Sequence, residues 1–198
     1  MSENTSTLVI ITASVREGRF GPVVTDWVAA RAREHGGFDV RVVDLAGVDL
    51  PLALPDASPK APGYPRPEGM RAVTELLDEA DAFVVVTPEY NHSYPAPLKT
   101  MIDWHGPHWQ AKPVAFVSYG GLSGGLRAVE HLRGVFAETH SVTLRDTVSF
   151  HGAWARFGPD GQPLDAEGCR AAAKTVLDQL AWWGWALRNA RIARPYAS

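Results

Sequence analysis

The chain has 198 residues, of which 45% are hydrophobic and 21% are charged. This length predicts one domain, residues 1–198, with a core large enough to need no disulfide or metal. The net charge of −3 gives no basic excess for a nucleic-acid backbone. A single cysteine excludes an intramolecular disulfide framework and favours the cytoplasm. Residues 1–7 form neither a signal peptide nor a transit peptide, and no apolar run is long enough to span a membrane.

Apolar and amphipathic stretches alternate along the chain. Buried strands are predicted at 8–12, 40–43, 82–87, 114–118 and 141–148. Helical periodicity follows each of them, at 23–35, 68–79, 98–104, 127–138 and 166–191. The alternation predicts an α/β fold, a doubly wound parallel sheet with helices on both faces. Five strands favour the flavodoxin-like order 2-1-3-4-5, in which ligands bind at the carboxyl ends of the strands.

The loop after the first predicted strand has the composition of an anion site. It carries the hydroxyl of Ser14 and the guanidinium groups of Arg16 and Arg19, and it enters a helix near Pro22. Together with free amides at the helix N-terminus, these groups predict a site for a phosphate monoester. The loop matches neither the dinucleotide fingerprint nor the nucleoside-triphosphate loop. The alternative is that both arginines are ordinary solvated residues on a turn.

The loops after the third and fourth strands predict contacts with a planar ligand. Three prolines stiffen residues 87–97, and we expect them to leave the intervening amides free for a ligand. Tyr90 and Tyr94 offer flat faces to a heterocycle, or else they pack within the loop. Four glycines between 118 and 126 permit close approach of the backbone to a ligand.

The glycine-rich loop also matches a hydrolase motif. Residues 121–125 read Gly-Leu-Ser-Gly-Gly, which fits the G-x-S-x-G nucleophile elbow. However, Ser123 lies well past the end of the predicted strand, and only Asp146 and His151 follow as a plausible acid and base. We therefore keep a serine hydrolase using Ser123 as an alternative below the binding-loop interpretation.

Three other features remain open at this point. The histidines at 92, 105 and 108 lack the companion ligands that complete a recognised metal site, so we expect no metal. Six prolines between 50 and 67 predict an irregular surface loop, with a lid or subunit contact as the alternative. The tryptophans at 182, 183 and 185 predict core packing or a subunit interface rather than a substrate cage.

Taken together, three motifs resemble the NADPH-dependent FMN reductase family. They are Ser14-x-Arg16-x-Gly18-Arg19, Pro88-Glu89-Tyr90-Asn91 followed by Leu98-Lys99-x-x-Ile102-Asp103-Trp104, and Ser118-x-Gly120-Gly121-x-x-Gly124-Gly125. The resemblance extends over residues 7–150 in the right order. It implies a flavodoxin-like fold, bound FMN, NADPH or NADH as the hydride donor, and a homodimer or homotetramer.

The resemblance also implies which residues hold FMN. The phosphate falls to Ser14, Arg16, Arg19 and the amides around Phe20 and Gly21. The isoalloxazine and ribityl groups fall to Pro88, Glu89, Tyr90 and Asn91 on one side, and to Ser118, Tyr119, Gly120 and Gly121 on the other. The chain departs from the family twice, because Ala13 replaces a common glycine and Arg19 replaces a small hydroxyl residue in many members.

The activity implied by the resemblance is hydride transfer from NADPH to N5 of FMN and onward to an acceptor. A quinone, an azo compound, free flavin or a metal ion would serve as that acceptor. No catalytic acid or base of the protein is required, and we expect the amides of Gly120 and Gly121 to stabilise negative charge on the reduced ring. Donor and acceptor sharing one open face would give ping-pong kinetics. The alternative is a non-enzymatic FMN-binding electron carrier or flavin sensor.

Overall fold

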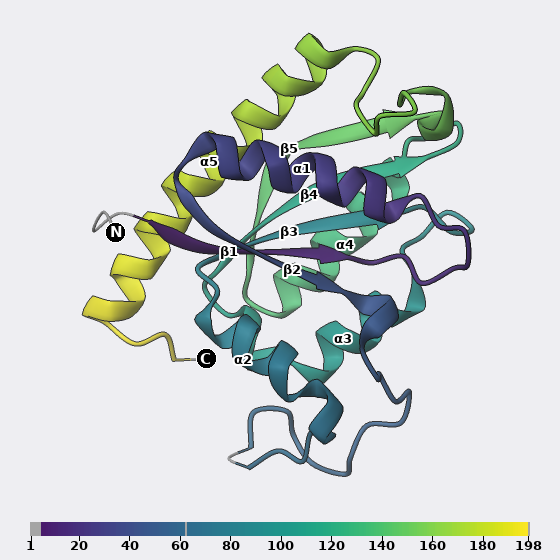
Figure 1. Ribbon diagram of the computed structural model, residues 1–198. Coiled ribbons are helices and arrows are strands. Elements are labelled where there is room, and N and C mark those ends of the chain that lie inside the picture. The colour runs from purple at the N-terminus through teal and green to yellow at the C-terminus, as the bar shows by residue number, and fades with distance from the viewer. Residues whose placement is uncertain (1–4, 62, 198) are drawn as a thin grey trace.

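A computed structural model describes residues 5–61 and 63–197 (Figure 1). The ends of the predicted domain, 1–4 and 198, and Pro62 of the proline-rich segment lie outside the described residues. Five strands form the sheet: β1 (Ser6–Thr12), β2 (Phe38–Asp44), β3 (Ala82–Pro88), β4 (Pro113–Gly120) and β5 (Val142–His151). They pair in parallel in the order β2-β1-β3-β4-β5, which confirms the predicted flavodoxin-like sheet.

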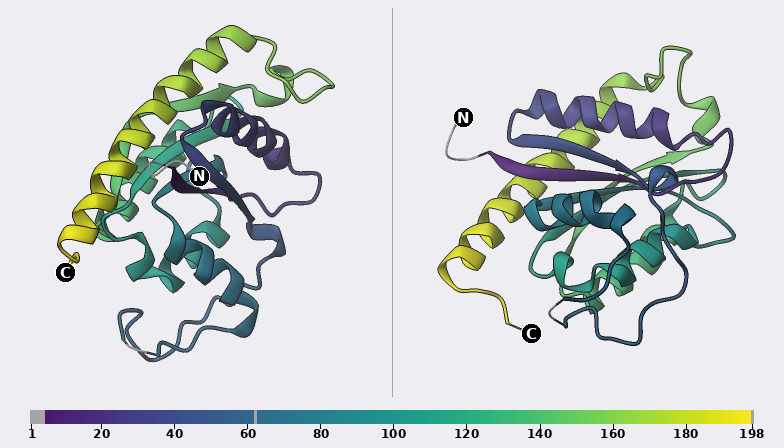
Figure 2. Two further views of the ribbon diagram at one scale, coloured as in Figure 1. Left: turned by 60° about the vertical axis from the view of Figure 1, so that its left-hand side comes forward. Right: turned by 60° about the horizontal axis from the view of Figure 1, so that its bottom comes forward.

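Helices cover both faces of the sheet (Figures 1 and 2). They are α1 (Gly21–His35), α2 (Arg71–Glu79), α3 (Ala96–Trp104), α4 (Leu126–Glu138) and α5 (Ala166–Ala193). Because side chains alternate along a strand, Leu8 and Ile10 of β1 enter the core under α1 and α5. Val9 and Ile11 enter the opposite core under α2, α3 and α4. The central strands β3 and β4 are buried throughout, as their continuous apolar runs predict.

Two element ends differ from the prediction by three residues, and the others by two at most. Residues 68–70 form a 3₁₀ turn, so α2 begins only at Arg71. Strand β5 runs to His151, three residues beyond its predicted end, because its pairing with β4 continues as far as Gly120 and His151. This longer strand carries the following turn to the carboxyl edge of the sheet.

The proline-rich segment 50–67 is an irregular loop, as predicted, and it packs on α3. Trp104 Nε1 donates to the Pro51 carbonyl at 2.8 Å, and Arg66 Nε donates to the Trp104 carbonyl at 3.0 Å. The Tyr64 ring lies 5.7 Å from the Trp104 ring. The described residues of the segment lie beside α2 and α3 (Figure 1) and do not line the cleft described below.

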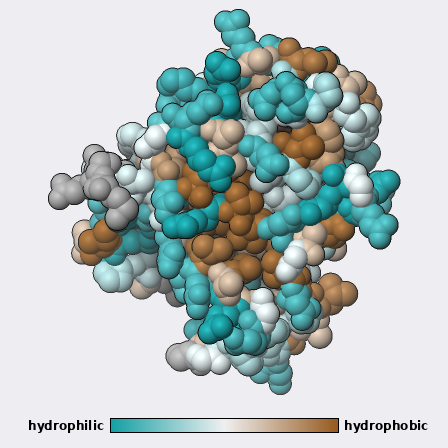
Figure 3. All heavy atoms as spheres, in the orientation of Figure 1, coloured by the Kyte–Doolittle hydropathy of each residue, from teal (hydrophilic) through white to brown (hydrophobic). Residues whose placement is uncertain are grey.

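Hydrophobic side chains also remain on the surface. In Figure 3 they gather over the middle of the face along which the edge strand β2 runs, where Val42 is 43% exposed. On α5, Trp182 and Trp185 are 60% and 54% exposed, so the expectation of core packing is wrong for these two residues. Among the described residues, no helix is both long and apolar enough to cross a membrane.

Candidate functional site

A cleft of about 420 Å³ opens at the carboxyl edge of the sheet. Nine of the thirteen predicted site residues line it: Arg16, Arg19, Phe20, Pro88, Glu89, Tyr90, Tyr119, Gly120 and Gly121. The other four, Ser14, Gly21, Asn91 and Ser118, do not. The sequence analysis missed three lining residues, which are Glu17, Gly18 and Trp154. Three loops far apart in sequence therefore meet where strand topology places a ligand.

The loop after β1 leaves polar groups unpaired beneath the N-terminus of α1. Ser14 Oγ and Tyr119 Oη are buried and have no hydrogen-bond partner among the described residues. Burial raises the pKa of Tyr119 to about 12, so its hydroxyl is a neutral donor at physiological pH. The helix comes close enough that a Cβ on Gly21 would collide with both hydroxyls. No side chain caps this helix, and its first turn contains no acidic residue.

The two arginines of this loop are in different electrostatic states. Arg19 donates to both carboxylate oxygens of Asp44, at 2.5 and 2.6 Å, and to the Ser14 carbonyl at 2.8 Å. Burial alone would raise the pKa of Asp44, but the hydrogen bonds from Arg19 and the Ala46 amide, together with the Arg19 charge, lower that pKa below its ordinary value. Arg16 is exposed and makes no ion pair with any residue in the described part of the chain. The Arg16 guanidinium is therefore free of an ion pair at the cleft, whose lining also includes the adjacent Glu17.

The loop after β3 is shaped by a tight turn. Tyr90 N donates to the Ser93 carbonyl at 2.8 Å, and Ser93 N donates back at 3.0 Å. Asn91 and His92 have φ of 49° and 69°, as in a two-residue hairpin turn. Glu89 N donates to the Tyr119 carbonyl at 3.2 Å. The expectation that this loop leaves its amides free is therefore wrong for Glu89 and Tyr90, whose amides complete the loop itself.

The other residues of this loop that were predicted to contact a ligand differ in whether they reach the cleft. Asn91 is exposed at the turn and lies outside the cleft, where its left-handed backbone suits asparagine. Tyr94 packs against the core under α2, α3 and α4, so Tyr90 alone of the two tyrosines faces the cleft. The side chain of Pro88 is buried at the end of β3, and the residue still lines the cleft floor.

The glycine-rich loop after β4 is held down by two serines. The carbonyl of Gly124 accepts hydrogen bonds from Ser118 Oγ and Ser149 Oγ, each at 2.8 Å. Gly125 has a φ of +88°, and a Cβ there would lie 2.7 Å from Ser118 Cβ and 3.0 Å from Tyr119 N. Ser118 thus anchors the loop from below, which explains why it does not line the cleft.

A buried carboxylate joins this loop to the loop after β3. The Glu89 side chain is 7% exposed. Its Oε2 accepts from Ser123 Oγ at 2.5 Å and from Arg127 N at 3.3 Å, while its Oε1 accepts from Arg127 Nε at 2.7 Å. Burial alone would raise the pKa of Glu89, but Ser123 and Arg127 outweigh it and hold that pKa below its ordinary value. Glu89 is therefore an ionised, satisfied carboxylate rather than a proton donor at neutral pH.

The same contacts contradict the serine-hydrolase alternative. Ser123 Oγ donates to Glu89, and not to a histidine. His151 Nδ1 contacts the Leu122 carbonyl at 3.0 Å, and Asp146 bonds Arg145 and Gln179. A catalytic triad requires hydrogen bonds from the nucleophile to the base and from the base to the acid, and Ser123, His151 and Asp146 do not bond one another in this way. The hydrolase alternative is wrong because the nucleophile elbow motif is here part of a cap on α4.

A family model of NADPH-dependent FMN reductases matches residues 6–155, which is most of the chain. The chain belongs to this family. The predicted family and enzyme class, an FMN-dependent NAD(P)H oxidoreductase, are thereby confirmed, and the chemistry of the three loops can be assessed against FMN.

Relatives in several kingdoms share this assignment. An NAD(P)H-dependent FMN reductase of Schizosaccharomyces pombe is 38% identical over 128 residues, which covers 61% of each protein and so less than two thirds of that relative. An NADPH:quinone oxidoreductase of Arabidopsis thaliana is 37% identical over 71% of this chain and 72% of its own. A 2-hydroxy-1,4-benzoquinone reductase of Burkholderia sp is 30% identical over 89% of this chain and 94% of its own.

Solved structures confirm the fold. The flavoenzyme NAD(P)H:(acceptor) oxidoreductase FerB from Paracoccus denitrificans superposes with a TM-score of 0.70 at 21% identity, covering 91% of this chain and 97% of its own. An archaeal flavodoxin superposes with a TM-score of 0.58 at 13% identity, covering 88% of this chain and 98% of its own. The flavodoxin-like architecture is thus shared well beyond recognisable sequence similarity.

The residues of the cleft fit FMN. A phosphate needs donors and positive charge, and the loop after β1 provides Arg16 and the free N-terminus of α1. The buried, unpaired hydroxyls of Ser14 and of Tyr119 from β4 lie beside Gly21 in the first turn of that helix. A flat ring needs a narrow slot of aromatic and backbone surface, and Tyr90, Gly120 and Gly121 line the other half.

Trp154 was not predicted as a site residue, yet it lines the cleft and adds a large aromatic side chain from the segment after β5. It lies on the short 3₁₀ turn Ala153–Ala155 directly after β5 and is 67% exposed. The prediction ended this strand at 148, so Trp154 seemed remote from the carboxyl edge. The available signal was position, because Trp154 follows the fifth predicted strand and the segments after parallel strands meet at the carboxyl edge of the sheet.

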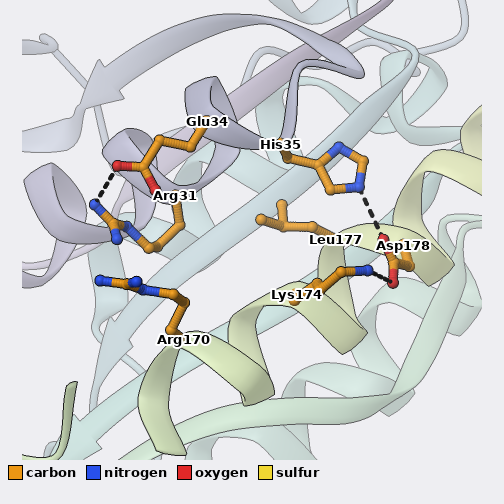
Figure 4. Close-up of a pocket in the computed structure, with 7 residues that line it drawn as sticks. All are labelled: Arg31, Glu34, His35, Arg170, Lys174, Leu177 and Asp178. Atoms are coloured by element: carbon orange, nitrogen blue, oxygen red, sulfur yellow. Dashed lines mark hydrogen bonds and ion pairs between the residues drawn. The ribbon is translucent and has the colours of Figure 1, made fainter. Parts of the chain in front are cut away.

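A second groove, of about 360 Å³, lies between α1 and α5 (Figure 4). Its cations are largely neutralised by its own carboxylates. Arg31 donates to Glu34 at 2.7 Å, and Lys174 donates to Asp178 at 2.7 Å. Arg170 is the groove's one cation without such a partner in the described part of the chain. The groove lies away from the carboxyl ends of the strands, where folds of this type bind their ligands, so we do not assign the family's chemistry to it.

Of the three histidines considered as metal ligands, His105 has a partner for each ring nitrogen. His105 is fully buried, with Nδ1 2.9 Å from the Met101 carbonyl and Nε2 3.0 Å from Thr74 Oγ1. Burial lowers the pKa of His105 to about 4, which keeps it neutral at physiological pH. Both ring nitrogens thus serve the packing of α2 against α3.

Proposed function

We propose that the chain uses the cleft at the carboxyl edge to hold FMN and to reduce a small quinone-class acceptor with NADPH or NADH. The observation that carries this proposal is the convergence of nine predicted residues from three separate loops on one cleft. When bound, FMN supplies the two-electron chemistry, accepting a hydride from the nicotinamide and delivering two electrons to the acceptor. The protein's own groups bind, orient and exclude water.

The loop after β1 is the proposed phosphate site. Arg16 provides charge, the N-terminus of α1 provides amides, and the hydroxyls of Ser14 and Tyr119 are donors without other partners. Arg19 lines the same wall, but its charge is balanced by Asp44. Arg19 therefore shapes the loop and adds a hydrogen bond rather than net charge.

The loops after β3, β4 and β5 form the proposed ring site. Tyr90 and Trp154 supply aromatic walls, and Gly120 and Gly121 allow the backbone to approach the ring edge. Amides of these two glycines stabilise negative charge that develops on the pyrimidine edge, as donors do in an oxyanion hole. No side chain is needed as an acid or base, in keeping with the ionised and fully bonded Glu89.

A quinone-class acceptor is supported by the names of the relatives. The Arabidopsis relative is an NADPH:quinone oxidoreductase, and the Burkholderia relative reduces 2-hydroxy-1,4-benzoquinone. If FMN were bound with one ring face open to the cleft, donor and acceptor would have to bind in turn. We therefore expect parallel double-reciprocal plots, as in ping-pong kinetics, and intersecting plots would contradict a shared face.

Assembly and location complete the proposal. The exposed tryptophans Trp182 and Trp185 of α5 form the face through which we propose a homodimer or homotetramer. Light scattering of the wild type and of Trp185→Gln tests it, since a monomeric wild type would contradict the interface. The lone cysteine agrees with a cytoplasmic location.

The test of the proposed function is a visible absorption spectrum of the protein, taken before and after anaerobic addition of NADPH. A flavin spectrum that bleaches, and that returns on addition of a benzoquinone, is the expected result. A flavin spectrum unchanged by both NADPH and NADH would instead support an electron carrier. Absence of flavin, even after reconstitution with FMN, would overturn the proposal.

A further inference from the structure

The cap on α4 is unusual because it comes from another part of the chain. Gly125 occupies the capping position, and its φ of +88° excludes most side chains there. Consequently the helix has no side-chain cap of its own, and its first turn contains no acidic residue. Arg127 places a positive charge in that turn, where the helix dipole disfavours cations. The N-terminus of α4 thus needs a carboxylate that its own sequence does not supply.

Glu89 supplies that carboxylate from the loop after β3. Its Oε2 accepts from the Arg127 amide at 3.3 Å, and its Oε1 is 2.6 Å from an Arg127 terminal nitrogen. Ser123 Oγ, within the glycine-rich loop, donates to the same carboxylate. With a side chain only 7% exposed, Glu89 would carry a costly unpaired charge if these donors were removed.

The position of this cluster relates it to the cleft. Glu89 is flanked by Pro88 and Tyr90 on one wall, and Ser123 follows Gly120 and Gly121 on the other. A Cβ on Gly120 would lie 3.7 Å from Glu89 Cβ, so the two loops are in direct contact. The contacts of Glu89 with Ser123 and Arg127 therefore connect the loop after β3 to the loop after β4, and both loops line the proposed ring site.

We propose that Glu89 is a positioning residue whose carboxylate, held by Ser123 and Arg127, fixes the glycine-rich loop against the loop after β3 and so sets the width of the ring slot. The expected effect on FMN binding rests on the proposed function. The contacts of Glu89 with Ser123 and Arg127 are present in the protein without FMN. Binding of FMN then requires no ordering of the slot, which lowers the entropic cost of association.

The consequence is measurable on the protein without FMN. Hydrogen exchange of the amides in residues 120–127, followed by mass spectrometry on cofactor-free protein, reports the order of the loop. We expect Glu89→Gln to accelerate this exchange at least tenfold and Ser123→Ala to accelerate it less, because Arg127 still holds the carboxylate. Glu130→Gln is the matched control, since Glu130 pairs with Arg133 further along α4.

Binding provides the second readout. Glu89→Gln should raise the Kd for FMN, measured by fluorescence titration of the cofactor-free protein, at least tenfold, with Glu89→Asp restoring part of the affinity. Coupling in a Glu89→Gln and Arg127→Met double-mutant cycle should make the two losses less than additive. Unchanged exchange and unchanged Kd in Glu89→Gln would overturn the inference. Wild-type protein that binds no FMN would overturn the proposed function, while the exchange experiment would still decide the role of Glu89.

Discussion

The two halves of the cleft satisfy their polar groups in opposite ways. In the half formed by the loop after β1 and the N-terminus of α1, the hydroxyls of Ser14 and of Tyr119 from β4 lack partners, and Arg16 makes no ion pair among the described residues. In the half formed by the loops after β3 and β4, Glu89 accepts from two residues and the Gly124 carbonyl accepts from two serines.

The difference indicates how each half recognises its part of the ligand. Buried polar groups without partners are costly, so the first half is completed by a ligand that brings acceptors and negative charge. The second half is complete without a ligand and therefore selects by shape. Disturbing the first half should change affinity alone, whereas disturbing the second should change loop order as well as affinity.

The largest effect is expected from Gly125→Ala. The substitution forces a side chain into a left-handed conformation and places its Cβ 2.7 Å from Ser118 Cβ. The loop must leave β4, so we expect at least a hundredfold loss of FMN affinity and a loss of about 2–4 kcal/mol in the free energy of unfolding. Fluorescence titration and urea denaturation measure the two effects.

A matched glycine provides the control for this substitution. Gly36 has a φ of +76° at the end of α1, and a Cβ there would meet nothing within 4 Å. Gly36→Ala should therefore lose about 1 kcal/mol of stability from backbone strain alone and leave the Kd for FMN unchanged. Equal losses of affinity in the two variants would show that the glycine-rich loop has no special role in the ring half.

Acid should weaken the second half through Glu89. The pKa of Glu89 in the folded protein lies below its ordinary value of 4.5. Its contribution is therefore fully present above the pKa of the unfolded state and is lost as pH falls through the lower folded pKa. Urea denaturation of cofactor-free protein between pH 7 and pH 3 should show a steeper decline in wild type than in Glu89→Gln, and parallel declines would contradict the expectation.

Arg16→Gln should affect only the first half. Loss of one charge-assisted contact with a phosphate corresponds to about 1.4 kcal/mol, or tenfold in the Kd for FMN. Because Arg16 is exposed and unpaired, the midpoint of urea denaturation of cofactor-free protein should not move. The salt dependence of the Kd should also decrease. Riboflavin, which lacks the phosphate, serves as the control ligand, and its affinity should be the same in wild type and variant.

The sequence alone predicted the sheet, its order and the edge at which the cleft opens, because buried parallel strands are continuous apolar runs and their topology brings the following loops together. Nine of the lining residues were named through the resemblance of three loop motifs to a known family. It did not predict that Asn91 forms a turn or that Ser118 anchors a loop. The hydrogen bonds are local, from Tyr90 to Ser93 and from Ser118 to Gly124, but they depend on the backbone path of each loop, which residue types alone do not determine.

The role of Glu89 shows the limit of motif reasoning most clearly. The Pro-Glu-Tyr-Asn motif indicated a contact with the flavin, yet the carboxylate is occupied by Ser123 and Arg127, 34 and 38 residues further along the chain. Likewise, G-x-S-x-G suggested a nucleophile because sequence cannot show which partner a serine meets. Only the pairing of the two loops distinguishes a nucleophile from a capping residue.

The smallest effect is expected from Arg19→Gln, and it tests whether charge or geometry governs the first half. Arg19 shares the loop with Arg16, but its guanidinium is held by Asp44 at 2.5 and 2.6 Å, so the pair brings no net charge to a phosphate. We expect less than a threefold rise in the Kd for FMN. Loss of the partly exposed ion pair should cost at most about 1 kcal/mol of stability. Asp44→Asn leaves Arg19 uncompensated and should tighten FMN binding at low salt. A tenfold loss in Arg19→Gln, together with no gain in Asp44→Asn, would mean that Arg19 reaches the phosphate despite its partner, and that the first half recognises its ligand by directed hydrogen bonds more than by charge.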